Sequence, residues 1–301
     1  MKPENLKTKI FLDSGDPTET REAIKLLGFL DGQTTNPSLI AKNPETAGRK
    51  FTTQELLGFY KAVVQEIAGL IPQGSVSIEV YADHQTTAEE MLSQGRQMFS
   101  WISNAHIKYP TTTEGLKAAS QSVKEGMRVN MTLVFSQRQA AAVHIATRGA
   151  QKGQVFVSPF IGRLDDRGEN GMDLIQNILH MYQKGDGHVE VLTASVRNLD
   201  HLLAAIQLGS DIVTSPAKVL KEWAEAGAQM PETGFTYRPE GLTPIPYEEI
   251  SLEKDWQTLD ITHELTYKGT EKFAQDWNNL LLVVDFEKAV VEFVEIEFLF
   301  P

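Results

Sequence analysis

The sequence predicts an α/β protein, namely a (β/α)8 barrel of the TIM type with a C-terminal helical extension. Two observations favour this fold class. Short β-branched or apolar runs alternate with longer amphipathic stretches along the chain, and this alternation is typical of parallel βα units with right-handed crossovers. Polar residues also stand at the C-terminal end of nearly every run, where barrel strands converge on one mouth. The alternative is an open doubly wound sheet, which would spread these residues along an edge.

The strand signal is a short run of β-branched or apolar residues between two helical stretches. The predicted strands are Lys9 to Ser14, Gly32 to Asn36, Ser75 to Tyr81, Ala105 to Tyr109, Arg128 to Phe135, Gln154 to Phe160, His188 to Ser195 and Asp211 to Ser215. Their regular separation by helical stretches predicts parallel pairing, because a parallel connection needs a crossover.

The helical stretches place apolar residues on one face, and several have capping residues at their ends. In the first helix Thr18 is the predicted N-cap and Gly28 the predicted C-cap. Gly126 is the predicted stop of the helix that opens at Thr113. The predicted helices are Thr18 to Leu27, Thr53 to Ala68, Thr113 to Lys124, Ser136 to Ala146, Gly171 to Tyr182, Leu199 to Leu208 and Ala217 to Ala226.

The chain beyond the eighth βα unit breaks this pattern. We therefore divide it into a catalytic barrel over residues 1–230 and a C-terminal loop, helix and tail over 231–301, packed on the barrel or extending from it. Pro231 to Ile250 is rich in Pro, Gly and Thr and predicts a loop. Thr262 to Val284 predicts a helix, whereas residues 286–301 fit neither the strand period nor the helix period.

Composition excludes several classes of protein. The 301 residues are 41% hydrophobic and 23% charged, as is ordinary for a globular protein. A formal net charge of -12 argues against a nucleic-acid or acidic-membrane binder. The chain has no cysteine, which rules out disulfides, thiolate metal sites and cysteine nucleophiles. No run reaches the length of a signal peptide or a membrane span, so we expect a cytoplasmic protein without a membrane partner.

The polar strand ends are the candidate active site, and Lys108 is the most informative of them. An inward-facing lysine is a costly structural choice, because an ammonium group loses its hydration on burial. It is a useful chemical choice, because a desolvated lysine amine attacks carbonyl groups and forms Schiff bases. The other candidates at or just after strand ends are Asp13, Asn36, Glu79, Asn130, Thr132, Ser158, Phe160, Arg163, Ser195 and Arg197.

Strand alternation predicts how some of these side chains point. Residues two apart share a face of a strand. Asn130 and Thr132 are therefore predicted to point into the barrel, while Met131 and Leu133 face the surrounding helices. By the same rule His106 lies on the face of Lys108, one layer deeper.

Each candidate alone also has an ordinary structural explanation. Lys108 could be a surface lysine, Asp13 a turn carboxylate, Glu79 a salt-bridged barrel residue and Arg163 an exposed ion pair. We predict that His106 is a hydrogen-bonded core histidine. The histidines show no metal-binding spacing, and HExxH, GxGxxG and GxxxxGK[ST] are absent, so no metal or cofactor is expected. Polar residues at the ends of so many strands that meet at one mouth nevertheless favour a shared site.

A barrel mouth lined by a lysine, two carboxylates, a threonine and two asparagines suits the cleavage and formation of carbon–carbon bonds through a Schiff base. A lysine attacks a ketone, and the resulting carbinolamine needs a proton donor in order to lose water. The protonated imine then withdraws electrons while a base removes a substrate hydroxyl proton and the carbon–carbon bond breaks. Two carboxylates on different strands can divide this work between them. Arginines after the sixth and seventh strands can hold a phosphate group bidentately.

At this point the motifs resemble those of the transaldolase family. They are LDSGD (12–16), TTNPSLI (34–40), SIEV (77–80), IKYPTTTEGLKA (107–118), NMTLVFS (130–136), SPFIGRLDD (158–166) and TASVRN (193–198). They follow in the order and at the intervals seen in that family. The resemblance covers roughly residues 9 to 225, and although each motif alone is only moderately specific, the full set in register is strong.

The resemblance implies a metal-free, Schiff-base (β/α)8 enzyme of carbohydrate metabolism. It would move a dihydroxyacetone unit between sugar phosphates of the pentose phosphate route, from sedoheptulose 7-phosphate or fructose 6-phosphate to glyceraldehyde 3-phosphate or erythrose 4-phosphate. Carried over by position, Lys108 matches the Schiff-base lysine, Asp13 the acid/base for the substrate hydroxyl, and Glu79 with Thr132 the pair that holds a catalytic water. Asn36, Asn130 and Ser158 match residues around the dihydroxyacetone hydroxyls, and Arg163 and Arg197, with Ser195, match the phosphate site.

Three features depart from the family pattern. Tyr109 replaces an aliphatic residue and is expected to face outward, and His106 stands where family members often have a smaller or apolar residue. The tail beyond about Phe286 has no counterpart in the family and could bind a partner. None of these departures touches the catalytic set. The resemblance leaves the oligomeric state open between a homodimer and another homo-oligomer.

Two other functions compete with transaldolase. The first is a fructose-6-phosphate aldolase, a shorter relative that releases free dihydroxyacetone and tends to carry tyrosine and glutamine where this chain has Phe160 and Glu79. Those two residues therefore favour transfer. The second is a non-catalytic sugar-phosphate-binding barrel, which predicts the loss of at least one catalytic group, whereas every group is present here.

Overall fold

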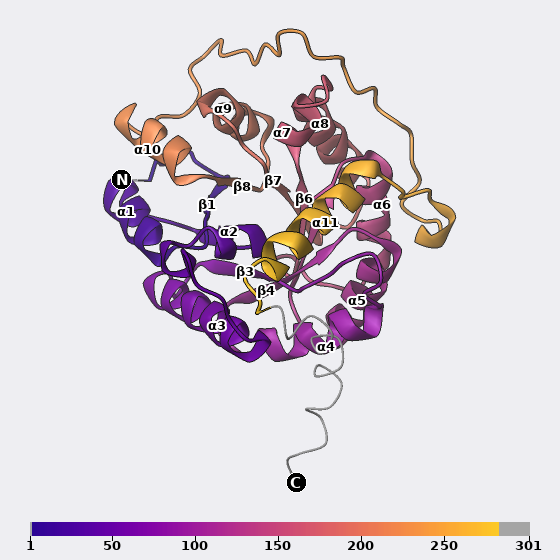
Figure 1. The fold of residues 1–301 in the computed structure, drawn as a ribbon. Helices are drawn as coiled ribbons and strands as arrows, with labels where there is room; N and C mark the ends of the chain where they lie inside the picture. The colour runs from indigo at the N-terminus through magenta and orange to yellow at the C-terminus, as the bar shows by residue number, and fades with distance from the viewer. Residues whose placement is uncertain (1, 283–301) are drawn as a thin grey trace.

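The computed structural model describes residues 2–282 and contains a closed barrel of parallel strands in the order β1 to β8 (Figure 1). The predicted fold class is confirmed. The strands are β1 Lys9–Asp13, β2 Gly32–Thr34, β3 Ser75–Glu79, β4 Ala105–Pro110, β5 Val129–Val134, β6 Val155–Pro159, β7 Val189–Thr193 and β8 Ile212–Ser215. Nearly all of their residues are buried, because helices cover the outside of the barrel and side chains fill its inside.

Helices surround the barrel, and most begin at a side-chain cap. Thr52 and Thr87, for example, each form a reciprocal capping box with a glutamate three residues later. The α-helices are α1 Pro17–Leu27, α2 Pro37–Ala41, α3 Thr53–Leu70, α4 Ala88–Phe99, α5 Thr113–Lys124, α6 Gln137–Ala146, α7 Ile161–Asp165, α8 Gly171–Tyr182, α9 Leu199–Leu208, α10 Ala217–Glu225 and α11 Glu264–Asn278, and the 3-10 turns are η1 Pro44–Thr46 and η2 Trp256–Thr258.

Several predicted boundaries are wrong by a residue or two. Most strands end early, because the residues after them already turn into the loops of the mouth. Thr18 is not the cap of α1, since Asp16 accepts the Thr18 backbone N–H at 2.8 Å and Pro17 occupies the first turn. Gly28 is confirmed as the C-cap in a left-handed conformation. Helices α2, α4 and α7 were not predicted.

The C-terminal part of the described chain wraps the barrel and then covers it. Residues 226–263 run around the outside past α9, α8 and α6, and α11 then lies across the barrel from the side of α6 towards α2 and α3 (Figure 1). The helix predicted over Thr262–Val284 is too long. It begins after the cap His263 and ends at Asn278, beyond which Leu280 and Leu282 pair with the backbone of Phe51.

The opposite, N-terminal end of the barrel is closed by aromatic packing. His106 stacks on Phe156 at 4.0 Å between ring centroids and contacts Ser75 Oγ and the Gly153 carbonyl oxygen at 2.7 and 2.9 Å. Phe11 packs edge-on against Phe156 at 6.1 Å. Burial lowers the pKa of His106 to about 3, so the ring is neutral. The prediction of a hydrogen-bonded core histidine is confirmed.

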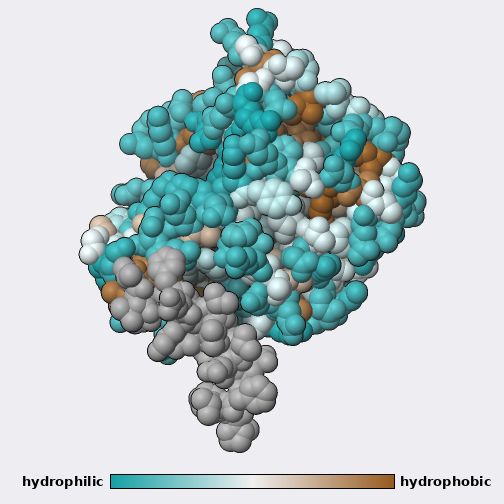
Figure 2. Space-filling view, turned by 45° about the vertical axis from the view of Figure 1, so that its right-hand side comes forward, coloured by the Kyte–Doolittle hydropathy of each residue, from teal (hydrophilic) through white to brown (hydrophobic). Residues whose placement is uncertain are grey.

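The surface is mostly hydrophilic on the face shown in Figure 2. On the face shown in Figure 2, apolar residues form small, separate patches among hydrophilic ones. Within residues 2–282, no helix combines the length and apolar character needed to cross a membrane.

Candidate active site

Lys108 and Glu79 form a buried ion pair at the mouth of the barrel. Strand register places them side by side on β4 and β3, and Lys108 Nζ lies 2.8 Å from Glu79 Oε2, with both side chains 4% exposed. Lys108 Nζ also donates to the Thr35 carbonyl oxygen at 3.0 Å. Breaking such a pair by removing one partner leaves an uncompensated buried charge. The amine is therefore held at a defined position beside a group that can take its proton.

Asp13 lies at the end of β1 and belongs to a chain of hydroxyl groups. Thr34 Oγ1 donates to Asp13 Oδ1 at 2.6 Å and lies 2.7 Å from Thr214 Oγ1. Because the Thr34 proton is used on Asp13, Thr214 is the donor in the second bond. Thr34 thus holds one oxygen of the Asp13 carboxylate in place, and the other oxygen accepts no hydrogen bond from the described residues.

Burial raises the pKa of both carboxyl groups. For Asp13 and for Glu79 the loss of hydration is the largest cause, and the attraction of Lys108 opposes it. A carboxyl group with a raised pKa holds or accepts a proton nearer neutral pH, which suits proton transfer at both positions.

The raised pKa makes a prediction about stability. Well below its ordinary pKa of 3.8, Asp13 is protonated in the folded and unfolded chains alike. As pH rises, the unfolded chain loses this proton first, so the folded state loses relative stability. Asp13→Asn removes the titration but keeps the acceptor for Thr34. We expect it to raise the free energy of unfolding at pH 7 by on the order of 1 kcal/mol, and urea denaturation should show this gain shrinking towards pH 4.

The control is Asp200→Asn, which removes an exposed carboxylate on α9. If the free energy of unfolding rises by the same amount at pH 7 and at pH 4, or rises equally in the Asp200 variant, the effect does not come from the titration of Asp13.

Asn130 points into the barrel, as predicted. The Asn130 amide donates to Ser77 Oγ at 3.1 Å and accepts from Ser158 Oγ at 2.6 Å, which connects β5 with β3 and β6. Thr132 Oγ1 is buried and has no hydrogen-bond partner among the described residues. A buried unpaired hydroxyl is costly unless a ligand or water completes it.

The strand after Thr132 departs from the predicted alternation. Leu133 has φ 58°, the pairing of β5 with β6 shifts between Met131 and Val134, and the Leu133 side chain lies against Gly269 of α11. Leu133 therefore faces the helix over the mouth rather than the helices around the barrel. A positive φ at a leucine stores strain, and such strain is concentrated at functional sites.

Asn36 begins α2 at the rim of the mouth. Its Oδ1 accepts the Leu39 backbone N–H at 2.8 Å, so this oxygen is used as a cap. The side chain is 7% exposed. Its amide nitrogen remains as the group that can donate to a ligand.

Arg163 and Arg197 form a cationic corner after β6 and β7. The Arg163 guanidinium lies over the rings of Phe160 and Phe273 at 5.3 and 5.4 Å. Burial, followed by repulsion from Arg197, lowers its pKa. Within residues 2–282 no carboxylate pairs with Arg163, whereas Arg197 Nη2 donates to Asp166 Oδ2 at 2.7 Å. Two adjacent guanidinium groups, one without a counter-ion, are suited to an anionic ligand.

The backbone brings the two arginines together. Ser195 has φ 61°, and its carbonyl oxygen accepts the Gly162 N–H at 3.1 Å. A Cβ at Gly162 would lie 2.3 Å from both this oxygen and Arg197 Nε, so only glycine allows this approach.

Some residues of the corner have no signal in the sequence. His201 Nδ1 accepts the Arg197 N–H at 3.3 Å, and its Nε2 lies 3.0 Å from Asp165 Oδ2. Because Nδ1 accepts, Nε2 carries the proton, and Nε2 donates it to the Tyr237 hydroxyl group at 3.0 Å. Phe273 and Gly269 come from α11, whose position over the mouth was not predicted. The outward direction of Tyr109 was predicted and is confirmed by its hydroxyl group, 3.0 Å from Ser122 Oγ of α5.

The comparisons with known proteins agree with one another. Residues 10–284 match a family model described as Transaldolase/Fructose-6-phosphate aldolase. A protein named probable transaldolase from Herpetosiphon aurantiacus is 42% identical over 272 residues, covering 90% of this chain and 96% of the relative. One from Dehalococcoides mccartyi is 42% identical over 214 residues (71% and 89%), and one from Brucella melitensis 37% over 269 (89% and 96%).

Distant matches are also found among solved structures. A 3-hexulose-6-phosphate synthase from Salmonella typhimurium aligns with a TM-score of 0.46 and 14% identity, over 73% of this chain and 97% of that protein.

Proposed function

We propose that this chain, which belongs to the transaldolase/fructose-6-phosphate aldolase family, is a transaldolase that works through a Schiff base on Lys108. It would transfer a dihydroxyacetone unit from fructose 6-phosphate or sedoheptulose 7-phosphate to an aldose phosphate. The observation that carries the proposal is the buried Lys108–Glu79 pair at one mouth with Asp13 and the unpartnered hydroxyl of Thr132.

Imine formation begins when Lys108 loses its proton to Glu79, 2.8 Å away. The free amine adds to the ketone carbon of the donor sugar and gives a carbinolamine. Glu79 returns the proton to the carbinolamine hydroxyl group, which leaves as water. Thr132 Oγ1 has its hydrogen-bonding capacity free to hold that water. The reverse sequence hydrolyses the imine at the end of the cycle.

Carbon–carbon cleavage is assigned to Asp13. In the imine of fructose 6-phosphate, Asp13 takes the proton of the C4 hydroxyl group, the C3–C4 bond breaks, and its electrons move onto the iminium nitrogen. Glyceraldehyde 3-phosphate leaves, and the dihydroxyacetone carbons stay on Lys108 as an enamine. The enamine then attacks an acceptor aldehyde, and Asp13 gives its proton to the new hydroxyl group.

The remaining site residues bind the two ends of the sugar. Asn36 can donate through its free amide nitrogen, and Asn130, held by Ser158, has an oxygen lone pair left for a dihydroxyacetone hydroxyl group. At the other end, Arg163 and Arg197 are suited to the phosphate group, and the rings that flank Arg163 keep it in place.

The test of this function separates transfer from simple cleavage. The chain is incubated with fructose 6-phosphate alone and with erythrose 4-phosphate added. A transaldolase forms sedoheptulose 7-phosphate in the second reaction and little free dihydroxyacetone in either. An aldolase of the same family would release free dihydroxyacetone in both reactions at similar rates, and that result would overturn the proposal in favour of the second activity.

Phe160 is expected to bias the enamine towards transfer. Its ring is 8% exposed and packs edge-on against Phe135 at 5.9 Å, so an apolar wall stands beside the site. Phe160→Tyr adds a hydroxyl group that can hold water for enamine protonation and imine hydrolysis. We expect free dihydroxyacetone release to rise roughly 10-fold or more relative to transfer, an effect of the size that one hydrogen bond to a charged group can supply.

The measurement is the ratio of free dihydroxyacetone to the transfer product sedoheptulose 7-phosphate, both formed from fructose 6-phosphate. Phe135→Tyr is the matched control, because it adds the same hydroxyl group to the neighbouring ring. An unchanged ratio in the Phe160 variant, or an equal rise in both variants, would remove Phe160 from this role.

A further inference from the structure

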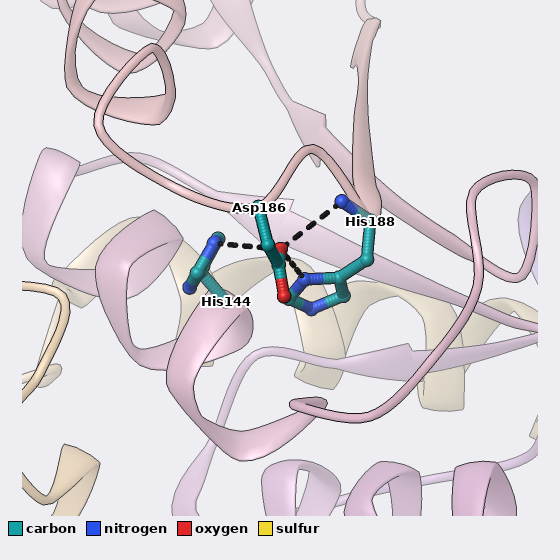
Figure 3. Close-up of side chains that lie close together, drawn as sticks. All are labelled: His144, Asp186 and His188. Atoms are coloured by element: carbon teal, nitrogen blue, oxygen red, sulfur yellow. Dashed lines mark hydrogen bonds and ion pairs between the residues drawn. The ribbon is translucent and has the colours of Figure 1, made fainter.

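A cluster of three potential metal ligands lies far from the active site. His144 is on α6, and Asp186 and His188 are in the loop between α8 and β7 (Figure 3). Since β7 begins at Val189, the cluster is at the N-terminal end of the barrel, opposite the mouth that holds Lys108. The ligand atoms of the three residues all lie within 4.8 Å of one another.

The burial of the His144 ring without a hydrogen-bond partner needs an explanation. It is 5% exposed, and neither ring nitrogen has a hydrogen-bond partner in the described chain. Buried imidazoles are normally paired, because each unpaired nitrogen forfeits its hydration. Its Nε2 lies 3.4 Å from Asp186 Oδ1, and a Cβ at Gly185 would lie 2.4 Å from the same nitrogen. The ring therefore fits only because residue 185 has no side chain.

The second histidine is held in the form that binds a metal through Nδ1. Thr147 Oγ1 donates to the Val143 carbonyl oxygen at 2.7 Å and lies 3.0 Å from His188 Nε2. Since the threonine proton is already used, His188 Nε2 must carry the proton of that bond. A second-shell partner of this kind commonly fixes a metal-binding histidine. His188 Nδ1 faces Asp186 Oδ1, so in the metal-free chain the two atoms share a proton that a metal ion can replace.

We propose that His144 Nε2, Asp186 and His188 Nδ1 bind one zinc ion. A tetrahedral ion with bonds of about 2.0–2.1 Å keeps its ligand atoms roughly 3.3 Å apart, close to the 3.4 Å between His144 Nε2 and Asp186 Oδ1. The Asp186–His188 contact opens slightly as zinc replaces the shared proton. Asp186 is 59% exposed, so solvent can reach the ion and supply a fourth ligand.

The ligand set selects the type of metal and its role. Two imidazoles with one carboxylate suit zinc, whereas calcium and magnesium prefer oxygen alone. The ion would join the end of α6 to the start of β7, two segments separated by more than 40 residues of chain. The site is at the N-terminal end of the barrel, and residues at that end of (β/α)8 barrels contribute to stability and not to catalysis. We therefore assign the ion a structural role.

The experiment uses the full chain without an affinity tag. Bound metal is removed with a chelator, the chelator is dialysed away, and zinc chloride alone is titrated in competition with a chromophoric chelator. We expect one ion per chain. With free zinc at about 100 times the dissociation constant, the melting temperature should rise by roughly 5 °C.

Two variants assign the binding to the cluster. Asp186→Asn keeps the shape of an exposed side chain and should weaken zinc binding by at least about 100-fold. His144→Gln should do the same. His180→Gln, which removes an exposed histidine on α8 outside the cluster, should bind zinc as the parent does.

Absence of stoichiometric binding to the folded parent would overturn the proposal, as would Asp186→Asn binding zinc with the parental affinity. If His144→Gln fails to fold, the exposed Asp186 variant decides alone. Both readouts are metal binding and stability, so they are independent of the proposed reaction.

Discussion

Lys108→Ala will carry no adduct after incubation with fructose 6-phosphate and borohydride, and its turnover will fall by roughly 10⁴- to 10⁶-fold, as expected when a covalent nucleophile is removed. The reason is that Lys108 is the buried amine paired with Glu79, whereas Lys42, the other lysine that acts electrostatically on Asp13, is exposed. The measurement is peptide mass spectrometry of the reduced protein, in which the parent should be modified on the β4 peptide at Lys108 alone.

The design has to separate chemistry from folding. Removing Lys108 leaves Glu79 buried without its partner, which costs about 3–5 kcal/mol when the carboxylate stays charged. Lys108→Met fills the same space and is the second variant, because it keeps the packing of the mouth. Lys117→Ala is the control for a nearby lysine, since Lys117 lies on α5 and pairs with Glu114 at the surface. An unmodified parent that is folded would contradict the Schiff base and favour a binding barrel without catalysis.

The sequence predicts the barrel well because its signal is local. Alternating strand and helix patterns determine the number and order of the strands, and the ends are less exact because the last residues of a strand continue its apolar pattern into the loop. Helix α4, which was not predicted, nevertheless has a local signal. Thr87 and Glu90 have the spacing of a capping box before an amphipathic stretch, and the structure shows both of its hydrogen bonds.

The covering of the mouth could not be predicted, because it depends on contacts between distant parts of the chain. Thr266 Oγ1 of α11 donates to the Leu133 carbonyl oxygen at 2.9 Å, and Asn278 donates to the Tyr81 hydroxyl group at 3.1 Å. A helix pattern gives an apolar face, but it does not say on which surface that face packs. The positive φ of Leu133 and of Ser195 is also hidden, because neither residue type indicates a left-handed conformation.

The two sites show the same limit of sequence analysis. Lys108, Glu79 and Asp13 are predicted together because each lies near the C-terminal end of a strand, and these ends meet in a barrel. His144 and His188 lack the spacing of a metal motif on one element, so the sequence does not indicate that they meet. They meet because α6 and the loop before β7 pack together, which is a property of the fold and not of any local stretch.

Asp13→Ala should form the imine and then stop. Asp13 is the group assigned to the C4 hydroxyl proton, and it takes no part in carbinolamine dehydration, for which Glu79 lies 2.8 Å from Lys108 Nζ. We expect turnover to fall by about 10²- to 10⁴-fold, the usual contribution of a general base. Borohydride should trap the whole hexose phosphate on Lys108, whereas in the parent part of the trapped material is the dihydroxyacetone unit.

The mass of the adduct is the sharper readout, because a variant that merely folds poorly lowers both adducts together. Asp13→Asn tests the charge alone, since it keeps the acceptor for Thr34 Oγ1, now 2.6 Å from Asp13 Oδ1. It should behave like the alanine variant in trapping while being more stable than the parent at pH 7. A dihydroxyacetone adduct in the parental proportion would show that cleavage proceeds without Asp13. The base would then have to be Glu79, the other carboxylate of the mouth, and one residue would serve both proton transfers.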